Sequence, residues 1–281
     1  MITEQTFEST DGLTENCKTA LRDLMLACAD TKLLLGYHYG EWTFGPPEIE
    51  AAIACCSLCQ TELGHVRLFH GLLNKHYGDD SDQLVEVRKP TEFANISYLD
   101  NEIKNWAEFV AANYVVDLAV TALLFSMQAS SFQPLHMSLE KMLQEEKYHI
   151  HHGQGWFRAL AQKSEETRNA LCEHTRTAVR SVVEWFGPDD SEADGELVAA
   201  GIKAESNAGI LTRVLTEIGN LAEALNVELG LIRSDDATWR YAQTIEWSGW
   251  NPQTRRVGQT GPDEDILYHL RGSKNKVFKL G

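Results

Sequence analysis

Two Glu-x-x-His pairs constrain this chain more than any other feature of its sequence. Glu62 and His65 form the first pair, and Glu146 and His149 form the second. Because three residues are just under one helical turn, each pair projects a carboxylate and an imidazole from the same side of a helix. Both pairs lie in long segments with apolar residues at spacings of three and four, a pattern that indicates helices. Two such pairs on separate helices supply half of a di-iron carboxylate site in a helical bundle.

Helical periodicity and turn residues divide the chain into a series of helices. The polar connection over residues 77–99 is long for a helix–helix loop, and a ferritin-like bundle requires a long crossover at this point. We therefore expect an all-α fold in a single domain, 1–281, with a ferritin-like four-helix bundle core over about 13–162 and additional helices and an irregular tail over 163–281. The predicted helices span about 13–39, 47–76, 102–130, 134–162, 165–186, 197–225 and 263–270.

A third carboxylate stands in the middle of an apolar segment. Asp117 interrupts the nearly continuous apolar run from Val110 to Met127, where an unpaired buried acid would be costly. A di-iron site in a bundle takes a Glu-x-x-His from each of two helices and one carboxylate from each of the other two. Carboxylates and imidazoles suit iron, and open positions then remain for dioxygen. The candidate metal ligands are therefore Glu62, His65, Asp117, Glu146 and His149, of which Glu62, Asp117 and Glu146 are the candidate catalytic residues.

The first helix carries a lysine where a sixth ligand is expected. Lys32 lies on the apolar stripe of that helix, whereas Asp30 lies roughly 200° further round at 100° per residue and is expected to point outward. His38 and Glu41 stand at the helix end and reach the centre only if the helix unwinds. An ammonium group has no free lone pair for iron. Lys32 therefore either tunes or reduces a metal site, or neutralises the carboxylates in place of a metal ion.

Several other side chains are expected to lie outside the ligand set. The second helix is predicted to place Ile49, Ile53 and Cys56 near the face that carries the first Glu-x-x-His pair. Glu145 is expected to be solvated. No second cysteine pair accompanies Cys56 and Cys59, so the cysteines indicate buried free thiols in a reducing cytosol. The remaining histidines of interest are expected at the surface or behind the ligands, and these are His70, His136, His151 and His152.

The charge balance restricts the partners. The sequence has 25 basic and 41 acidic side chains, a net charge of −16 at pH 7, which argues against binding nucleic acid or an anionic membrane surface. The N-terminal residues show no basic region followed by an apolar run, so no signal peptide is predicted. No apolar run approaches the ~18 residues of a transmembrane helix. These features predict a cytoplasmic protein that acts neither on nucleic acid nor in a membrane.

The motifs resemble those of the ferritin-like subunits of bacterial phenylacetyl-CoA epoxidase, the phenylacetic acid catabolic protein family. Residues 39–42 (Tyr-Gly-Glu-Trp) and 47–50 (Pro-Glu-Ile-Glu) are similar to a stretch of the structural, non-catalytic subunit, as are residues 113–125 and 148–156. The five candidate ligands instead match the metal-binding pattern of the catalytic subunit. That pattern has a glutamate where this chain has Lys32.

This resemblance implies a subunit of a multicomponent oxygenase. The catalytic subunit of the family uses two iron ions and O2 to epoxidise the aromatic ring of an acyl-CoA, with electrons from a reductase component. A homologous ferritin-like subunit is then the expected partner, in a homo- or hetero-oligomer. Three alternatives remain open for this chain. It is a di-iron or mono-metal monooxygenase subunit, a non-catalytic structural partner with Lys32 salt-bridged to the carboxylates, or a ferritin-like iron oxidase.

Overall fold

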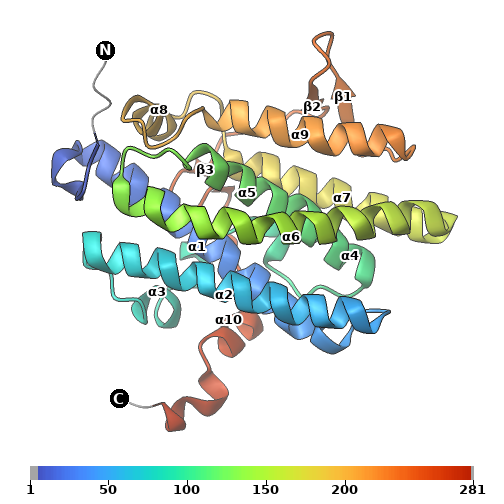
Figure 1. Ribbon diagram of the computed structural model, residues 1–281, viewed down its shortest axis with the longest axis horizontal. Helices are drawn as coiled ribbons and strands as arrows, with labels where there is room; N and C mark the ends of the chain where they lie inside the picture. Colours follow the sequence, from blue (N-terminus) through green and yellow to red (C-terminus); the bar gives the residue numbers. More distant parts are fainter. Residues whose placement is uncertain (1–5, 280–281) are drawn as a thin grey trace.

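The computed structural model describes residues 6–279, which form an all-α bundle with two small β-hairpins (Figure 1). Four long helical segments build the core, as predicted for a ferritin-like bundle. In Figure 1, α2 and α6 lie in front of α1 and α5. The four segments are α1 (Glu15–Glu41), α2 (Ile49–Tyr77), a composite third helix (α4, Trp106–Ala111; a π-helical segment, Ala112–Val116; α5, Asp117–Ser126) and α6 (Gln133–Lys163).

Caps and turn residues set the helix ends close to their predicted positions. Thr14 accepts a hydrogen bond from a first-turn N–H of α1, and Ser164 does the same for α7 (Glu165–Phe186). Between α1 and α2, a short 3-10 turn (Trp42–Phe44) and the pair Pro46-Pro47 reverse the chain. The two helices consequently pack along one another as an antiparallel hairpin, which brings their midpoints together.

Helix α1 is enclosed by its neighbours, and the prediction that Asp30 points outward is wrong. Every residue of α1 from Leu24 to Gly36 is buried. The long crossover between α2 and α4 covers the face of α1 that the bundle leaves open. There, the carboxylate of Asp30 pairs with Arg88 and accepts a hydrogen bond from the N–H of Ala94 at 2.9 Å. The angular position was predicted correctly, but a helix inside a domain has no solvent-facing side.

The third helix is a core helix with a π-helical segment directly before Asp117. By length and composition the stretch Trp106–Ser126 is apolar enough to cross a membrane, which the sequence prediction did not anticipate. However, 94% of its apolar window is buried inside the bundle. Helix α6 approaches the π segment closely at Gly153, where a Cβ atom would come within 2.9 Å of the Tyr114 Cα. This contact fixes the register between α6 and the helix that carries Asp117.

The C-terminal third adds helices and a tail to the bundle. The continuous helix predicted over 197–225 is wrong. It is two helices, α8 (Glu192–Ala199) and α9 (Asn207–Ala224), because Gly201 takes a left-handed backbone (φ 72°) and Ser206 caps α9.

The shorter elements are η1 (Thr10–Gly12), α3 (Gln83–Glu86), η3 (Pro90–Glu92), η4 (Ser97–Leu99), β1 (Leu231–Arg233) paired antiparallel with β2 (Trp239–Tyr241), β3 (Trp250–Asn251) paired antiparallel with β4 (Arg256–Val257), α10 (Glu264–Leu270) and η6 (Ser273–Phe278).

Helix α2 leaves an apolar strip in solvent. Ile49 and Ile53 are 69% and 64% exposed, and Phe44 in the preceding turn is 98% exposed. The prediction that these isoleucines and Cys56 share the face of Glu62 is wrong. Nine residues separate Ile53 from Glu62, and at 100° per residue this places them on opposite sides of the helix. We call Phe44, Ile49 and Ile53 the α2 apolar strip.

Candidate functional site

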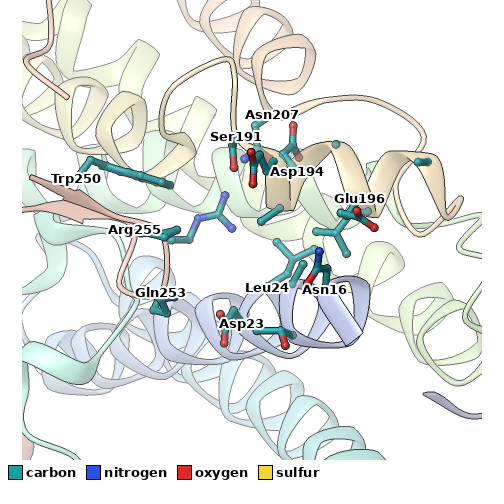
Figure 2. A pocket seen from close by; sticks show the side chains of 18 residues that line it. Asn16, Asp23, Leu24, Ser191, Asp194, Glu196, Asn207, Trp250, Gln253 and Arg255 are labelled. Carbon is teal, nitrogen blue, oxygen red and sulfur yellow. Dashed lines mark hydrogen bonds between the residues drawn. The ribbon is translucent and has the colours of Figure 1, made fainter. Parts of the chain in front are cut away.

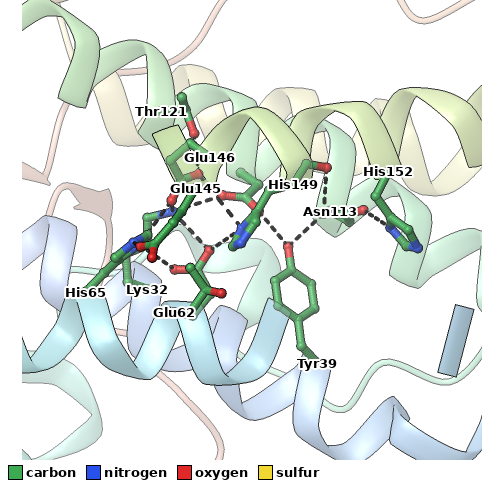
Figure 3. A network of polar contacts seen from close by, with 12 residues as sticks. Lys32, Tyr39, Glu62, His65, Asn113, Thr121, Glu145, Glu146, His149 and His152 are labelled. Atoms are coloured by element: carbon green, nitrogen blue, oxygen red, sulfur yellow. Dashed lines mark hydrogen bonds and ion pairs between the residues drawn. The ribbon is translucent and has the colours of Figure 1, made fainter. Parts of the chain in front are cut away.

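Six side chains from four helical segments meet in the middle of the bundle (Figure 3). Helix α1 contributes a lysine, α2 and α6 contribute one Glu-x-x-His pair each, and α5 contributes the aspartate. All six residues are at most 2% exposed, so water screens the charges of their side chains poorly. The six residues are Lys32, Glu62, His65, Asp117, Glu146 and His149.

The ammonium group of Lys32 lies between the three carboxylates. Its Nζ donates hydrogen bonds to Glu62 Oε1 at 3.0 Å, to Asp117 Oδ1 at 3.0 Å and to Glu146 Oε1 at 2.6 Å. These three contacts use all the donors that an ammonium group has. Burial alone would lower the pKa of Lys32, but the three carboxylates raise it well above its usual value. The lysine is therefore a buried, fully hydrogen-bonded cation.

His149 supplies a second positive charge. Its Nδ1 lies 3.0 Å from Glu62 Oε1 and 3.0 Å from Asp117 Oδ2. Burial opposes the charged ring, but Asp117 and Glu62 raise the pKa of His149 to about 11. Burial likewise opposes ionisation of Asp117, yet Lys32 and His149 hold its pKa well below the usual range. The pKa of Glu62 is raised, because burial and the neighbouring carboxylates outweigh Lys32.

His65 joins the cluster to the surface through Glu145. The His65 Nε2 lies 2.9 Å from Glu145 Oε2. The side chain of Glu145 is 34% exposed, so it is partly solvated but also contacts the cluster. Burial alone would raise the pKa of Glu145, but the hydrogen bond with His65 lowers it. The His65 Nδ1 lies 3.1 Å from Glu146 Oε1 and 3.8 Å from Glu62 Oε2. Within residues 6–279, neither His65 Nδ1 nor Glu62 Oε2 has a hydrogen-bond partner.

A chain of hydrogen bonds connects Asp117 to the half-buried His152 on α6. The Tyr39 hydroxyl donates to Asp117 Oδ2 at 2.9 Å, and Asn113 Nδ2 donates to the Tyr39 oxygen at 3.1 Å. The Asn113 Oδ1 lies 2.7 Å from His152 Nδ1. The sequence predicted His152 at the surface or behind the ligands, and it lies behind them. Tyr39 and Asn113 were not identified from the sequence.

Thr121 was also not identified, although a signal for it exists. Its hydroxyl donates to Glu146 Oε2 at 2.6 Å. Asn113, Asp117 and Thr121 are spaced four residues apart in an otherwise apolar segment. Residues four apart lie on one side of a helix. A polar stripe on the core helix therefore marks the side that faces the cluster.

Other predicted residues lie elsewhere. Helix α1 continues to Glu41, which is exposed, and His38 Nε2 lies 3.0 Å from the Leu99 carbonyl oxygen, so neither side chain enters the cluster. His70 is buried, which contradicts a place at the surface, and burial lowers its pKa. It is not one of the six side chains that meet at the centre. The two histidines that lie at the surface as predicted are His136 and His151.

The cysteines are free, but not all are buried. Cys17, Cys28 and Cys55 are buried as predicted, whereas Cys56 is exposed and Cys59 is half-buried. Cys56 lies on the side of α2 that faces solvent. The prediction placed it on the wrong face of the helix, as it did Ile49 and Ile53.

The side chains have the composition of a metal site, but their arrangement does not fit a di-iron centre. Glu62, Asp117, Glu146 and His149 each offer one ligand atom, and these atoms lie within 4.8 Å of one another. However, the Lys32 ammonium already lies at hydrogen-bond distance from the three carboxylates. A metal ion at that position would meet a positive charge. Lys32 also occupies the first-helix position at which a carboxylate would complete the ligand set.

The helical core with a Glu-x-x-His pair on each of two helices at its centre has the architecture of a ferritin-like bundle. The chain belongs to the phenylacetic acid catabolic protein family, whose sequence profile matches residues 2–246. It is 25% identical over 195 residues to one of the subunits of 1,2-phenylacetyl-CoA epoxidase from Escherichia coli K12, an alignment that covers 66% of this chain and 79% of the relative.

Proposed function

We propose that this chain is a non-catalytic structural subunit of a multicomponent oxygenase of the phenylacetyl-CoA epoxidase type. The observation that carries the proposal is the three-way contact of Lys32 Nζ with Glu62, Asp117 and Glu146 at 2.6–3.0 Å. Similarity to one of the subunits of such an epoxidase supports membership of this kind of assembly. With a lysine at the centre, the carboxylates that would otherwise bind metal form ion pairs that stabilise the core.

The chemistry of an ammonium group explains why such a cluster does not activate oxygen. Iron in a bundle site stabilises the buried carboxylates and also changes oxidation state while it binds dioxygen. Lys32 supplies only the first of these properties, because it has no free lone pair and no accessible redox state. With His149 it offsets two of the three carboxylate charges. Epoxidation of an aromatic acyl-CoA, with O2 and electrons from a reductase, then belongs to a homologous ferritin-like subunit.

The α2 apolar strip supports a role in assembly. Phe44, Ile49 and Ile53 are each more than 60% exposed, and large side chains that gather in solvent mark protein contact surfaces. The strip lies on the side of α2 opposite Glu62, so a partner seated there would bury it without altering the cluster. We assign this surface to the homologous ferritin-like subunit.

One observation favours a second candidate, a single-metal site. Glu62 Oε2 and His65 Nδ1 are buried without hydrogen bonds among the described residues and lie 3.8 Å apart. These two atoms are potential metal ligands that no hydrogen bond occupies. A metal ion held between them would leave the contacts of Lys32 in place. The iron oxidase alternative has no comparable observation in its favour.

Reconstitution of turnover distinguishes these functions. The chain would be assayed for O2-dependent epoxidation of phenylacetyl-CoA with reductase, alone and together with a homologous ferritin-like subunit that carries the complete ligand set. We expect no turnover by the chain alone and a higher rate when both subunits are present. Glu146→Gln, compared with the surface control Glu140→Gln on the same helix, is expected to keep that rate as long as the protein is folded.

Two outcomes contradict the proposal. Turnover by the chain alone would make it a catalytic subunit. Loss of turnover in a folded, assembled Glu146→Gln complex would show that the cluster takes part in the reaction. Retention of turnover, together with an unchanged complex on size-exclusion chromatography, is the result that a structural role requires.

A further inference from the structure

A cavity separate from the polar cluster opens between α1, α8 and the C-terminal tail (Figure 2). Its volume is about 640 Å³, which lies within the usual range of small-molecule pockets. The N-terminal half of α1 forms one wall, α8 forms another, and the segment from Trp250 to Arg255 closes the third. Both Trp250 and Arg255 lie beyond residue 246, where the family match ends.

Arg255 points into this cavity with most of its donors unused. The residue is only 7% exposed, its Nε donates to the Trp185 carbonyl oxygen at 2.9 Å, and its guanidinium lies 4.3 Å from the Trp185 ring centre. In the part of the chain from residue 6 to 279, neither Nη atom has a hydrogen bond or an acidic partner. Figure 2 shows the guanidinium directed into the open space. The Nη donors that face this space are therefore available to a ligand.

The neighbouring arginine has partners for both of its Nη atoms, although its Nε has no hydrogen bond among the described residues. Arg256 is 2% exposed, and its Nη atoms donate to Asp100 Oδ2 at 2.7 Å and to Asn95 Oδ1 at 3.0 Å. The fold therefore supplies partners to one of two adjacent buried arginines. The planar fork of Arg255 remains available, and its natural partner is a carboxylate or another planar anion.

The opposite walls carry negative charge. Asp194 is already saturated, because it pairs with Lys203 and accepts from the Asn207 N–H at 2.8 Å. Asp23 is not, since its nearest cation is the Arg22 Nη1 at 3.7 Å. Glu196 also lines the cavity. A simple anion on Arg255 would be repelled by Asp23 and Glu196, whereas a ligand with an ammonium group would be attracted by them.

Beside the charged groups, the cavity also has apolar and rigid wall residues. The Trp250 Nε1 donates to the Glu184 carbonyl oxygen at 2.8 Å, and its ring packs on Gly187, where a Cβ atom would come within 2.4 Å of the ring. Leu24 lines the cavity from α1. An apolar ligand body fits between such surfaces.

We propose that this cavity binds a small zwitterion with an apolar body, the chemistry of an aliphatic or aromatic amino acid. Its carboxylate pairs with the Nη atoms of Arg255, and its ammonium group faces Asp23 and Glu196. The apolar side chain lies against Trp250 and Leu24. This site is independent of the Lys32 cluster and of the assignment of the chain as an oxygenase subunit.

Three related probes test the proposal by isothermal titration calorimetry on the full chain. L-Leucine carries both charges, 4-methylpentanoate lacks the ammonium group, and 3-methylbutylamine lacks the carboxylate. We expect leucine to bind at least about tenfold more tightly than either analogue, since each lost charge removes a charge-assisted hydrogen bond. Arg255→Gln is expected to weaken leucine by a similar factor, and Arg240→Gln, at an exposed arginine, is expected to change nothing.

A second variant keeps the test decisive if Arg255→Gln disturbs the tail. Asp23→Asn is expected to weaken leucine and 3-methylbutylamine while it strengthens 4-methylpentanoate, a change of preference that loss of structure does not produce. Far-UV circular dichroism confirms folding of each variant. The proposal is overturned if none of the probes binds folded wild-type protein at millimolar concentrations, or if leucine binds folded Arg255→Gln as well as wild type. Arg255 would then only hold the tail against Trp185.

Discussion

Replacement of Lys32 by methionine is the perturbation that most directly exposes the energetics of the cluster. Methionine has a similar volume and leaves little empty space, so the change removes mainly the ammonium group. Glu62, Asp117 and Glu146 then lose the ammonium group that contacts all three of them, while His149 remains. Removal of one partner from a buried ion pair costs about 3–5 kcal/mol. Because Lys32 contacts three fully buried carboxylates, we expect a loss of stability within or above that range at neutral pH.

The pH dependence has a definite sign. Without Lys32, the pKa of the remaining carboxyl groups rises above the unfolded value of about 4. A group with a raised folded-state pKa is stabilising below the unfolded pKa, and this contribution disappears as pH rises through the folded-state pKa. The deficit of Lys32→Met is therefore largest at neutral pH and becomes smaller as the solution is acidified. Glu62, whose pKa is already raised in the wild type, is the first carboxyl expected to take up a proton.

Urea denaturation monitored by circular dichroism measures this deficit. The experiment contains a chelator, because vacating the centre of the cluster creates a cation site. Without the chelator, added Fe²⁺ or Mn²⁺ is expected to recover part of the lost stability by binding the native state. The control is Lys141→Met on α6, whose ion pair with Glu145 lies at the surface and contributes less than about 1 kcal/mol. If Lys32→Met is no more destabilising than Lys141→Met in chelator at neutral pH, the carboxylates do not require a central cation and the reasoning fails.

Three further predictions concern other parts of the molecule. His149 has a pKa raised from 6.5 to about 11, so the wild type should lose stability as pH rises between these values; His149→Gln should show a flatter stability profile there, and an unchanged slope would remove His149 as the titrating group. Ile53→Glu, with Ile232→Glu at the exposed β1 site as control, should weaken assembly with the homologous subunit at least about tenfold at unchanged thermal stability, because a charge enters an apolar contact; normal assembly would place the interface elsewhere. Asp30→Asn should destabilise the chain by about 3 kcal/mol in urea, since it leaves the half-buried Arg88 without its buried carboxylate partner; a loss below about 1 kcal/mol would show that this pair is dispensable.

The parts of the site that follow a local rule were predictable from the sequence. Glu62 with His65, and Glu146 with His149, are fixed by the turn of a single helix, and the cost of a buried acid identifies Asp117 without knowledge of its neighbours. These residues do meet at the centre of the bundle. The same local rule also offers Asn113 and Thr121 through their spacing from Asp117.

The features that depend on packing between distant segments were not predictable. The burial of Asp30 requires Arg88, which arrives from a crossover 58 residues away. The misplacement of Ile53 and Cys56 has a different cause, because helical periodicity, applied at 100° per residue, already puts Ile53 on the side of α2 opposite Glu62. The break between α8 and α9 depends on the backbone of Gly201 and on a cap at Ser206, both of which lie within an otherwise helical pattern.

The content of iron per chain, in wild type and in Lys32→Glu, tests the central claim most directly. Both proteins would be expressed with added iron, purified in parallel and analysed for metal by inductively coupled plasma mass spectrometry. If the Lys32 ammonium takes the place of a metal ion, the wild type contains far less than one iron per chain, and Lys32→Glu, which restores a carboxylate at the first-helix position, contains more, approaching the two ions of a di-iron site. Stoichiometric iron in the wild type, or no gain of iron in folded Lys32→Glu, would contradict this account.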